Sequence, residues 1–239
     1  MLFLVKNLKA HYSGDNMDEY VILVDENDNL IGKEDKVKCH LPNGKLHRAF
    51  TALIFRNSGK LLLTKRSGSK MLWPGVWDGT VASHPREGED YYQAGERRIP
   101  EEIGVGCADR LHFLNKFEYH VPYKDIGSEN EICATLIGRM GDSESTNEIW
   151  HHRRNPDEIS DIKWISPDEL KKELEENMDE YCPWMVIALY FLATYPNPST
   201  IEKYSPYCIK WVSDDLKRVY ENAIKHYIPD NNWRLMPTL

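Results

Sequence analysis

Short apolar runs separated by polar turns recur along the first two thirds of the chain, a pattern typical of β-strands. Strands are predicted at Tyr20 to Val24, Leu46 to Phe55, Lys60 to Lys65, Leu111 to Tyr119, Glu131 to Met140 and Ile162 to Ile165. A further short strand and a charged connector are expected after the polar turn Asp25 to Asn29. The turn Arg56 to Gly59 makes the second and third runs a hairpin candidate, and a polar insertion is expected from Gly141 to Pro156.

Other segments carry the boundary signals of helices. Helices are predicted at Asp90 to Ile103, from Pro167 onward, at Pro183 to Tyr195 and at Asp214 to His226. Gly104 is a typical helix-ending residue, whereas Pro100 favours a kink or an early end. Ser166 and Glu169 form a capping box, and Ser213 is the expected cap of the last helix. Strands interleaved with few helices predict an α+β fold with a mixed sheet.

The bulk properties narrow the class of protein. The 239 residues can bury one sizeable core, and a net charge of −8 argues against a general nucleic-acid binder. The longest apolar run, Trp184 to Ala193, has about half the length of a membrane span. The start, Met1 to Val5, is too short for a signal-peptide core. Five cysteines without Cys-x-x-Cys spacing favour reduced thiols, so a cytoplasmic location is expected.

Candidate metal ligands recur along the sequence. They are His40, His47, His84, Glu129 and Glu131. Glu129 and Glu131 stand at i and i+2 of a strand, so both carboxylates point to one face. Mixed nitrogen and oxygen ligands suit Zn, Mn or Mg rather than a redox copper centre. We therefore expect a metal-dependent enzyme that acts on a phosphorylated small molecule.

The segment Ser83 to Val105 follows the spacing of the Nudix box, Gly-x5-Glu-x7-Arg-Glu-U-x-Glu-Glu-x-Gly-U, in which U is a bulky apolar residue. The matching residues are Glu89, Arg97, Ile99, Glu101, Glu102, Gly104 and Val105. Ser83 replaces the first glycine, and Arg98 replaces a metal-binding glutamate. Arg98 and Glu102 lie one helical turn apart, so their side chains can hold a diphosphate with its Mg²⁺. A match over so many fixed positions disfavours an ordinary solvated helix face.

With its flanking residues, the chain closely resembles type 1 isopentenyl-diphosphate Δ-isomerases, a branch of the Nudix superfamily. The resemblance covers roughly Tyr20 to Ala193 and rests on Cys39-His40, Leu46 to Phe50, Lys65-Arg66-x3-Lys70, Trp73 to Trp77, Ser83 to Pro85, Arg97-Arg98, Tyr119, Glu129 to Glu131 and Pro183 to Met185. Arg98 in place of glutamate is itself a feature of those isomerases. The resemblance implies a Nudix fold, a mixed β-sheet sandwiched between helices. It also implies interconversion of isopentenyl and dimethylallyl diphosphate in isoprenoid biosynthesis.

The resemblance assigns roles position by position. One divalent ion, Mn²⁺, Zn²⁺ or Mg²⁺, would be bound by His40, His47, His84, Glu129 and Glu131. The diphosphate would be embraced by Lys36, Arg66, Lys70 and Arg98, while Glu102 would touch a second ion, Mg²⁺, bound to it. Glu131 and Tyr119 would serve one proton transfer, and Trp184 would face the carbocation formed between the two transfers.

Ala82 departs from the family, which places its essential cysteine at this position. A methyl group has no exchangeable proton, so the second proton transfer lacks its group. Three explanations remain open: a deliberate Cys-to-Ala change, divergence to another reaction on the same diphosphates, or a substitute group. The candidate substitutes are Ser83, Cys182 and a water molecule.

Two alternatives to an isomerase impaired by Ala82 also remain open. The acidic pair Glu101-Glu102 and the missing thiol would suit a Nudix hydrolase of prenyl or nucleoside diphosphates. A catalytically silent prenyl-diphosphate-binding protein is the other alternative. We expect a Nudix domain over residues 1–195 and a C-terminal helical extension over residues 196–239. The aromatic residues of this extension could cover the pocket or form a subunit contact, and the sequence leaves the oligomeric state open.

Overall fold

The computed structural model describes residues 20–141 and 152–237, apart from the side chain of Tyr204. The strands are β1 (Tyr20–Val24), β2 (Leu30–Asp35), β3 (His47–Phe55), β4 (Leu61–Arg66), β5 (Trp77–Asp78), β6 (Val81–Ser83), β7 (His112–Tyr123), β8 (Gly127–Arg139), β9 (Ile159–Ile165) and β10 (Trp233–Leu235). The helices are α2 (Lys36–His40), α3 (Tyr91–Ile103), α5 (Pro167–Glu176), α6 (Pro183–Ala193), α7 (Pro198–Tyr204) and α8 (Asp214–Tyr227), with 3-10 turns η2 (Met178–Glu180) and η3 (Pro206–Trp211). The expectation for the first five residues, and most of that for the polar insertion, falls outside the described residues.

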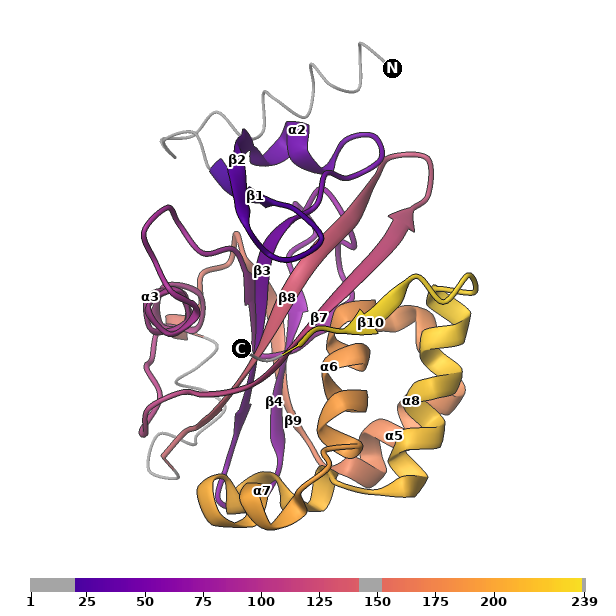
Figure 1. Ribbon diagram of the computed structural model, residues 1–239. Helices are drawn as coiled ribbons and strands as arrows, with labels where there is room; N and C mark the ends of the chain where they lie inside the picture. Colours follow the sequence, from indigo (N-terminus) through magenta and orange to yellow (C-terminus); the bar gives the residue numbers. More distant parts are fainter. Residues whose placement is uncertain (1–19, 142–151, 238–239) are drawn as a thin grey trace.

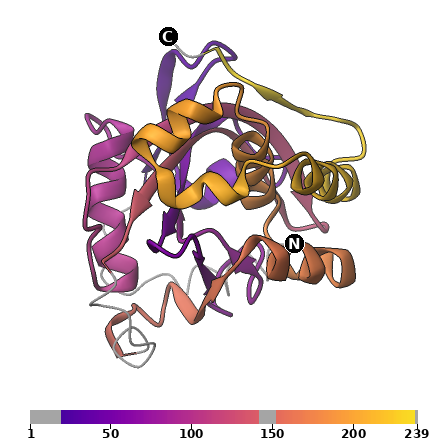
Figure 2. The same ribbon diagram turned by 90° about the horizontal axis from the view of Figure 1, so that it is seen from below.

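One mixed sheet organises the molecule (Figure 1). Its strand order is β10-β7-β8-β3-β1-β2, and β4, β5, β6 and β9 branch from β3. β3 and β8 run parallel, from the pair His47–Glu131 to the pair Phe55–Arg139, whereas the neighbouring strands pair antiparallel. α3 lies on one side of the sheet, and α6 lies on the other with α5 and α8 beside it (Figures 1 and 2). The predicted α+β class, with a mixed sheet between helices, is confirmed.

The alternation of side chains along β3 divides the interior into two cores. Phe50, Ala52 and Ile54 pack in the cluster that contains buried residues of α3. Leu53 and Phe55 belong to the larger cluster, which contains α6 and α8. A central strand that is buried on both faces explains the nearly unbroken apolar run that predicted it.

The predicted strands are present, but their partners and their lengths differ in part from the prediction. The predicted hairpin of β3 and β4 is paired only at Phe55 and Leu61, beyond which β4 pairs with β9. β7 and β8 form a longer hairpin than expected, reaching Tyr123 and Gly127. The extra residues of β8 include Glu129, which lines a cavity and which the sequence had already placed on one strand with Glu131.

The helix boundaries follow their capping signals. Ser166 and Glu169 form the predicted capping box of α5, and Ser213 caps α8. Gly104 ends α3 in the left-handed conformation, as predicted. Pro100 lies inside α3, and the helix continues past it to Ile103, so the proline does not shorten it. The expected charged connector contains the short helix α2.

The segment after α6 packs against the main sheet. Trp211 and Tyr220 are fully buried in the larger core, alongside residues of α6. β10 adds to the edge of the sheet, where it pairs antiparallel with β7. These aromatic residues therefore contribute to the core of the same molecule.

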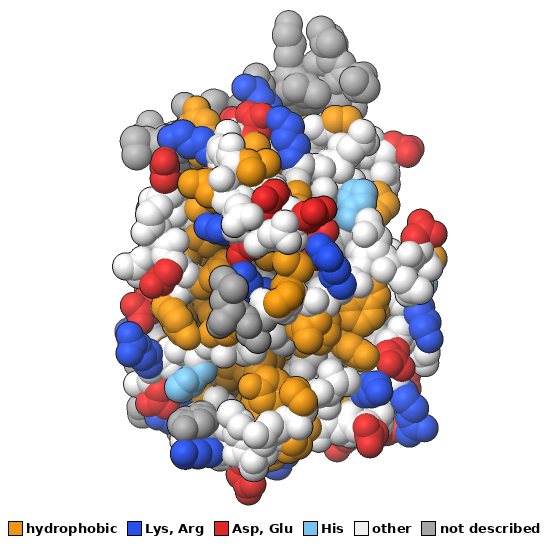
Figure 3. Space-filling view, viewed as in Figure 1, with side chains coloured by type: hydrophobic (Ala, Val, Ile, Leu, Met, Phe, Trp, Pro, Cys, Tyr) orange, Lys and Arg blue, Asp and Glu red, His pale blue; other side chains and the backbone are white. Residues whose placement is uncertain are grey.

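The surface carries charges of both signs. On the face shown in Figure 3, Lys and Arg are interspersed with Asp and Glu, while hydrophobic side chains gather toward the centre. Among the described residues, no helix combines the length and the apolar character that a membrane crossing requires. All five cysteines are free.

Candidate active site

The predicted metal ligands come from separate elements at one end of the β3–β8 pair. Glu129 and Glu131 occupy alternate positions of β8, so both carboxylates leave the same face. His47, the first residue of β3, is the cross-strand partner of Glu131. His40 closes α2, and His84 directly follows β6. The fold thus brings together five residues that lie far apart in the sequence.

The tips of these side chains converge. Nε2 of His47 lies 3.2 Å from Nε2 of His84, and both nitrogens lie 3.3 Å from Oε1 of Glu131. Nε2 of His40 lies 3.0 Å from Oε2 of Glu129. One ligand atom from each of His40, His47, His84 and Glu131 lies within 4.8 Å of the others.

The donor set fits a divalent cation. Nδ1 of His40 lies 2.6 Å from the carbonyl oxygen of Lys36, and Nδ1 of His47 lies 2.8 Å from that of Lys45. Because a carbonyl oxygen only accepts, we assign the ring protons to Nδ1, which leaves the Nε2 lone pairs directed at the centre. The buried Oε2 of Glu129 makes no hydrogen bond with the described residues. This cluster could therefore hold one divalent metal ion.

Tyr119 and Glu131 form a buried pair beside this cluster. They are cross-strand partners in β7 and β8, and the Tyr119 hydroxyl donates a hydrogen bond of 2.6 Å to Oε2 of Glu131. Burial, reinforced by the charge of Glu131, raises the pKa of Tyr119 well above its ordinary value. Burial opposes ionisation of Glu131, but the adjacent His47 ring and the hydrogen bond from Tyr119 outweigh it and lower the pKa of its carboxyl. The pair can thus keep a proton on the phenol, next to an ionised carboxylate.

Trp184 forms an aromatic wall at the start of α6. Its ring centre lies 6.4 Å from that of Tyr119 and 5.3 Å from that of Trp73. The indole nitrogen donates a 2.8 Å hydrogen bond to Asp78, which also accepts one of 3.2 Å from Arg66. The Arg66 guanidinium lies 5.1 Å from the Trp184 ring centre. Asp78, which sequence reasoning missed, therefore fixes the positions of two predicted site residues.

A cavity of about 530 Å³ connects the metal-ligand cluster with Trp184. Ala82 lines this cavity together with Glu131, and in β6 it pairs with Thr51 of β3, whose partner on β8 is Thr135. Cys133, two residues after Glu131, lines the cavity as well and was not singled out from the sequence. A hollow of about 690 Å³ beside β2 contains none of the predicted site residues.

The groups considered as substitutes for the missing thiol differ in position. Ser83 lines the cavity. Cys182 is fully buried and does not belong to the cavity lining, and burial raises the pKa of its thiol well above the ordinary value. Of the two side chains considered as substitutes, Ser83 therefore lines the cavity and Cys182 does not.

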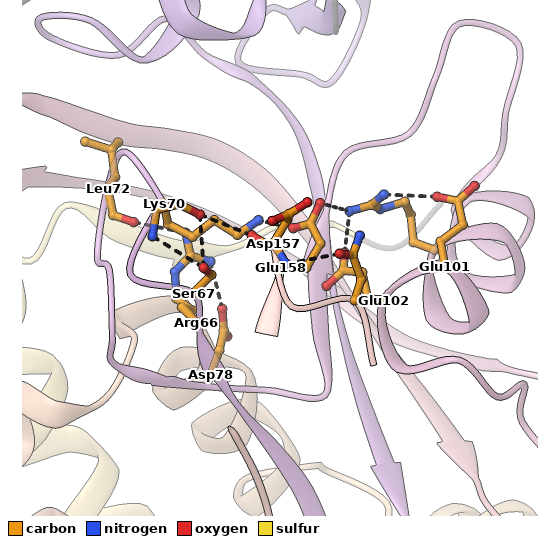
Figure 4. A network of polar contacts seen from close by, with 12 residues as sticks. Arg66, Ser67, Lys70, Leu72, Asp78, Glu101, Glu102, Asp157 and Glu158 are labelled. Carbon is orange, nitrogen blue, oxygen red and sulfur yellow. Dashed lines mark hydrogen bonds and ion pairs between the residues drawn. The ribbon is translucent and has the colours of Figure 1, made fainter. Parts of the chain in front are cut away.

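The four predicted diphosphate-binding cations, here called the cationic cradle, are Lys36, Arg66, Lys70 and Arg98. The first three line the cavity, whereas Arg98 does not. Arg98 instead meets the carboxylates of Glu101 and Glu102 on its own helix and that of Glu158 (Figure 4). Lys70 is also ion-paired with Glu158. Three of the four cations of the cradle are thus already engaged by carboxylates.

Glu158 is a site residue that sequence reasoning missed. The same Nη2 atom of Arg98 lies 3.0 Å from Oε1 of Glu158 and 2.6 Å from Oε1 of Glu102. Burial raises the pKa of Glu102 to about 7, despite Arg98. Burial also opposes ionisation of Glu158, but Lys70 and Arg98 outweigh it and lower the pKa to about 2. Its sequence context, Asn-Pro-Asp-Glu after a polar insertion, resembles an ordinary turn and gave no signal.

Other residues of the Nudix box brace the site from outside. Arg97 donates two hydrogen bonds to Glu89, of 2.6 and 2.8 Å, and one of 3.4 Å to the carbonyl oxygen of His84. Glu101 lies 3.4 Å from Arg97 and 3.0 Å from Arg98. Arg97 thereby connects α3 with the segment that presents His84 to the cluster.

Comparisons with known proteins bear on the family of this chain. A NUDIX domain model matches residues 45–185, more than half of the chain. The isopentenyl-diphosphate Delta-isomerase of Haloarcula marismortui is 36% identical over 178 residues, which cover 73% of this chain and 91% of the relative. That of Photorhabdus laumondii is 37% identical over 167 residues, covering 70% and 90%. The chain belongs to the isopentenyl-diphosphate isomerase family. The resemblance inferred from the sequence is confirmed.

The fold comparison is consistent with this family. A crystal structure from Deinococcus radiodurans aligns with a TM-score of 0.52 at 24% identity, covering 66% of this chain and 90% of that chain. This likeness concerns the fold alone. In this isomerase-family protein, the segment from α7 to β10 lies beyond the matched NUDIX domain.

Proposed function

We propose that this protein interconverts isopentenyl and dimethylallyl diphosphate, the activity that the names of its relatives describe. The observation that carries the proposal is the Tyr119–Glu131 pair, which adjoins the metal-ligand cluster in the cavity that Trp184 lines. The cavity also meets three residues of the cationic cradle, where a diphosphate would bind.

The reaction moves one double bond and conserves all atoms. The terminal alkene carbon gains a proton, which leaves a tertiary carbocation, and a proton then departs from the methylene on the other side. Tyr119, hydrogen-bonded to Glu131, can exchange the first proton with the alkene. The face of Trp184 can stabilise the cation by about 2 kcal/mol in a site without water. When bound, a divalent ion supplies positive charge that orients Glu131 and stabilises its carboxylate.

We assign two ions to the site by their ligands. The histidines and Glu131, with Glu129 next to them, suit Zn²⁺, Mn²⁺ or Mg²⁺. The all-oxygen environment of Glu102 and the diphosphate suits Mg²⁺. The substrate is a small prenyl diphosphate in the leading proposal, and a prenyl or nucleoside diphosphate in the hydrolase alternative.

Ala82→Cys is the direct test of the isomerase proposal. A thiol at position 82 would line the same cavity as Glu131 and restore the second proton-transfer group. Since a positioned acid or base contributes roughly 10²–10⁴-fold, the variant is expected to exceed the unmodified protein by that factor. Formation of dimethylallyl diphosphate from isopentenyl diphosphate by the metal-loaded protein is the measurement. Ala82→Ser is the matched control and is expected to remain slow.

Failure of the cysteine variant to form any dimethylallyl diphosphate would reject the isomerase. Phosphate release from prenyl or nucleoside diphosphates would instead indicate the Nudix hydrolase. Engagement of both Glu101 and Glu102 by Arg98 weakens that alternative, since it leaves less free negative charge for catalytic metal ions. Tight binding without turnover in either protein would indicate a silent prenyl-diphosphate-binding protein.

A further inference from the structure

We propose that Glu158 makes diphosphate binding conditional on an accompanying divalent cation. In the free protein its carboxylate pairs with Lys70 and Arg98, and a diphosphate must take its place to reach them. The displaced carboxylate then faces the cation that the diphosphate carries. The inference rests on the proposed function only in placing a diphosphate in this cavity.

The charge balance of the cradle is the first argument. Asp78 neutralises Arg66, since a carboxylate oxygen of Asp78 lies 3.2 Å from the guanidinium. Glu102 and Glu158 both contact Arg98. Glu158 also pairs with Lys70. A diphosphate with several negative charges therefore meets three cradle cations whose charge is already matched by carboxylates, beside Lys36. A divalent cation bound to it would supply the missing charge.

The position of Glu158 in the cavity wall is the second argument. Glu158 lines the cavity, whereas its partner Arg98 does not, so a phosphate in the cavity meets this carboxylate before it meets Arg98. Side-chain exposure of about 20% leaves the carboxylate in reach of such a phosphate. A guanidinium binds phosphate as readily as carboxylate, so one anion can replace the other on it.

The anchored backbone around Glu158 is the third argument. The carbonyl oxygen of Glu158 accepts a 2.9 Å hydrogen bond from the amide of Ser67, in the loop that carries Lys70. The amide of Asn155 donates one of 2.7 Å to the carbonyl oxygen of Glu102 at the end of α3. The segment is therefore fixed at both ends, and the Glu158 side chain can turn without moving either cation.

Inorganic pyrophosphate and calorimetry provide a test that needs no turnover. In the presence of a chelator, the unmodified protein is expected to bind pyrophosphate weakly, and Mg²⁺ is expected to tighten binding at least tenfold. Glu158→Gln removes the negative charge of this side chain while keeping its shape. Its affinity for pyrophosphate in the presence of the chelator is therefore expected to rise about tenfold, a factor that corresponds to one modest charge interaction. The gain from Mg²⁺ is expected to shrink in this variant.

Asp157→Asn is the matched control, because it removes an equal charge from the adjacent cavity-lining residue. An equal gain in Asp157→Asn would show a general charge effect and overturn the proposal. If Glu158→Gln binds pyrophosphate in the presence of the chelator as weakly as the unmodified protein, or more weakly, the proposal is overturned as well. If Glu158→Gln does not fold, a structure of the unmodified protein with Mg²⁺ and pyrophosphate decides. Phosphate oxygens in place of Glu158 on Lys70 support the proposal, and a retained Lys70–Glu158 pair overturns it.

These outcomes are independent of isomerase activity. A protein that fails to isomerise isopentenyl diphosphate could still show the Glu158 effect on pyrophosphate. Conversely, an active Ala82→Cys enzyme with no Glu158 effect would leave the proposed function intact and reject only this inference.

Discussion

Glu158 remains ionised far below neutral pH because two cations surround it. Burial opposes its charge, but Lys70 and Arg98 lower its pKa from 4.5 to about 2. The folded protein therefore holds this proton less tightly than the unfolded chain does. The resulting stabilisation is fully present above about pH 4.5 and disappears as the pH falls toward 2.

Glu158→Gln is accordingly expected to lower the free energy of unfolding most at neutral pH. A shift of this size corresponds to at most about 3 kcal/mol, and partial exposure to solvent reduces that figure. Urea unfolding of both proteins at pH 7, 5 and 3 is the measurement, in the presence of a chelator. The difference should narrow between pH 5 and 3, and a constant difference at all three pH values would contradict the assignment.

Individual site residues were predictable where a motif fixed their spacing. The three histidines and Glu131 were expected from the sequence, and the fold brings them together. Asp78, Cys133 and Glu158 were not expected, because each acquires its importance from neighbours on other strands. A buried acid can be recognised only when its partners are known, and local sequence does not reveal them.

Among the elements, β10 has an unexpected relation to the site. Trp233 pairs with Tyr119 across β10 and β7. Its ring centre lies 5.2 Å from that of Tyr190 and 5.6 Å from that of Phe191, both on α6. The C-terminal segment thus connects the strand of Tyr119 with the helix that begins beside Trp184. Three residues are too few for a strand to be recognised from their pattern alone, so the sequence did not predict β10.

Trp233→Ala is expected to loosen the edge of β7 at Tyr119. Truncation of a half-buried aromatic residue is expected to cost roughly 1–3 kcal/mol, somewhat less than a fully buried one. Hydrogen exchange of the amides of β7 and β10 is the measurement, and exchange near Tyr119 should accelerate. Arg234→Ala, which removes an exposed neighbour paired with Glu118, is the control and should change exchange near Tyr119 much less. Equal acceleration in both variants would contradict a specific role for Trp233.

Pairing between elements was harder to predict than the elements themselves. The runs around Leu53 and Leu63 were recognised as strands, but β4 pairs mainly with β9 rather than with β3. An apolar run shows that a strand is buried, whereas its partner is chosen by the packing of the whole sheet. The helix ends at Gly104 and Ser166 were predictable because capping is local.

For the whole molecule, one core unites the sheet, α6 and the C-terminal helices. The metal-ligand cluster lies at one end of the β3–β8 pair, at the centre of the sheet. An ion bound there contacts only the folded state, so its binding free energy adds to the stability of the entire molecule.

Removal of divalent ions is therefore expected to lower the melting temperature. A free ion concentration of one hundred times Kd adds about 2.7 kcal/mol, and each kcal/mol corresponds to about 2–4 °C for a chain of this size. Thermal unfolding of chelator-treated protein with and without Mn²⁺ or Zn²⁺ is the measurement. His84→Ala should lose most of the increase, while His226→Ala, a surface histidine paired with Asp179, should keep it. Equal increases in both variants would place the ion elsewhere.

The register of the β3–β8 pair has a consequence for the life of the newly made chain. His47 and Glu131 are direct neighbours only in this register, and a slip by one residue would turn Glu131 to the opposite side. Before the two strands meet, the histidines and the pair Glu129 and Glu131 are separate groups of ligands, and neither group alone offers the full set. A divalent ion would therefore meet the full set of ligands only in a chain whose β3 and β8 have paired in this register, so that its binding would report correct assembly.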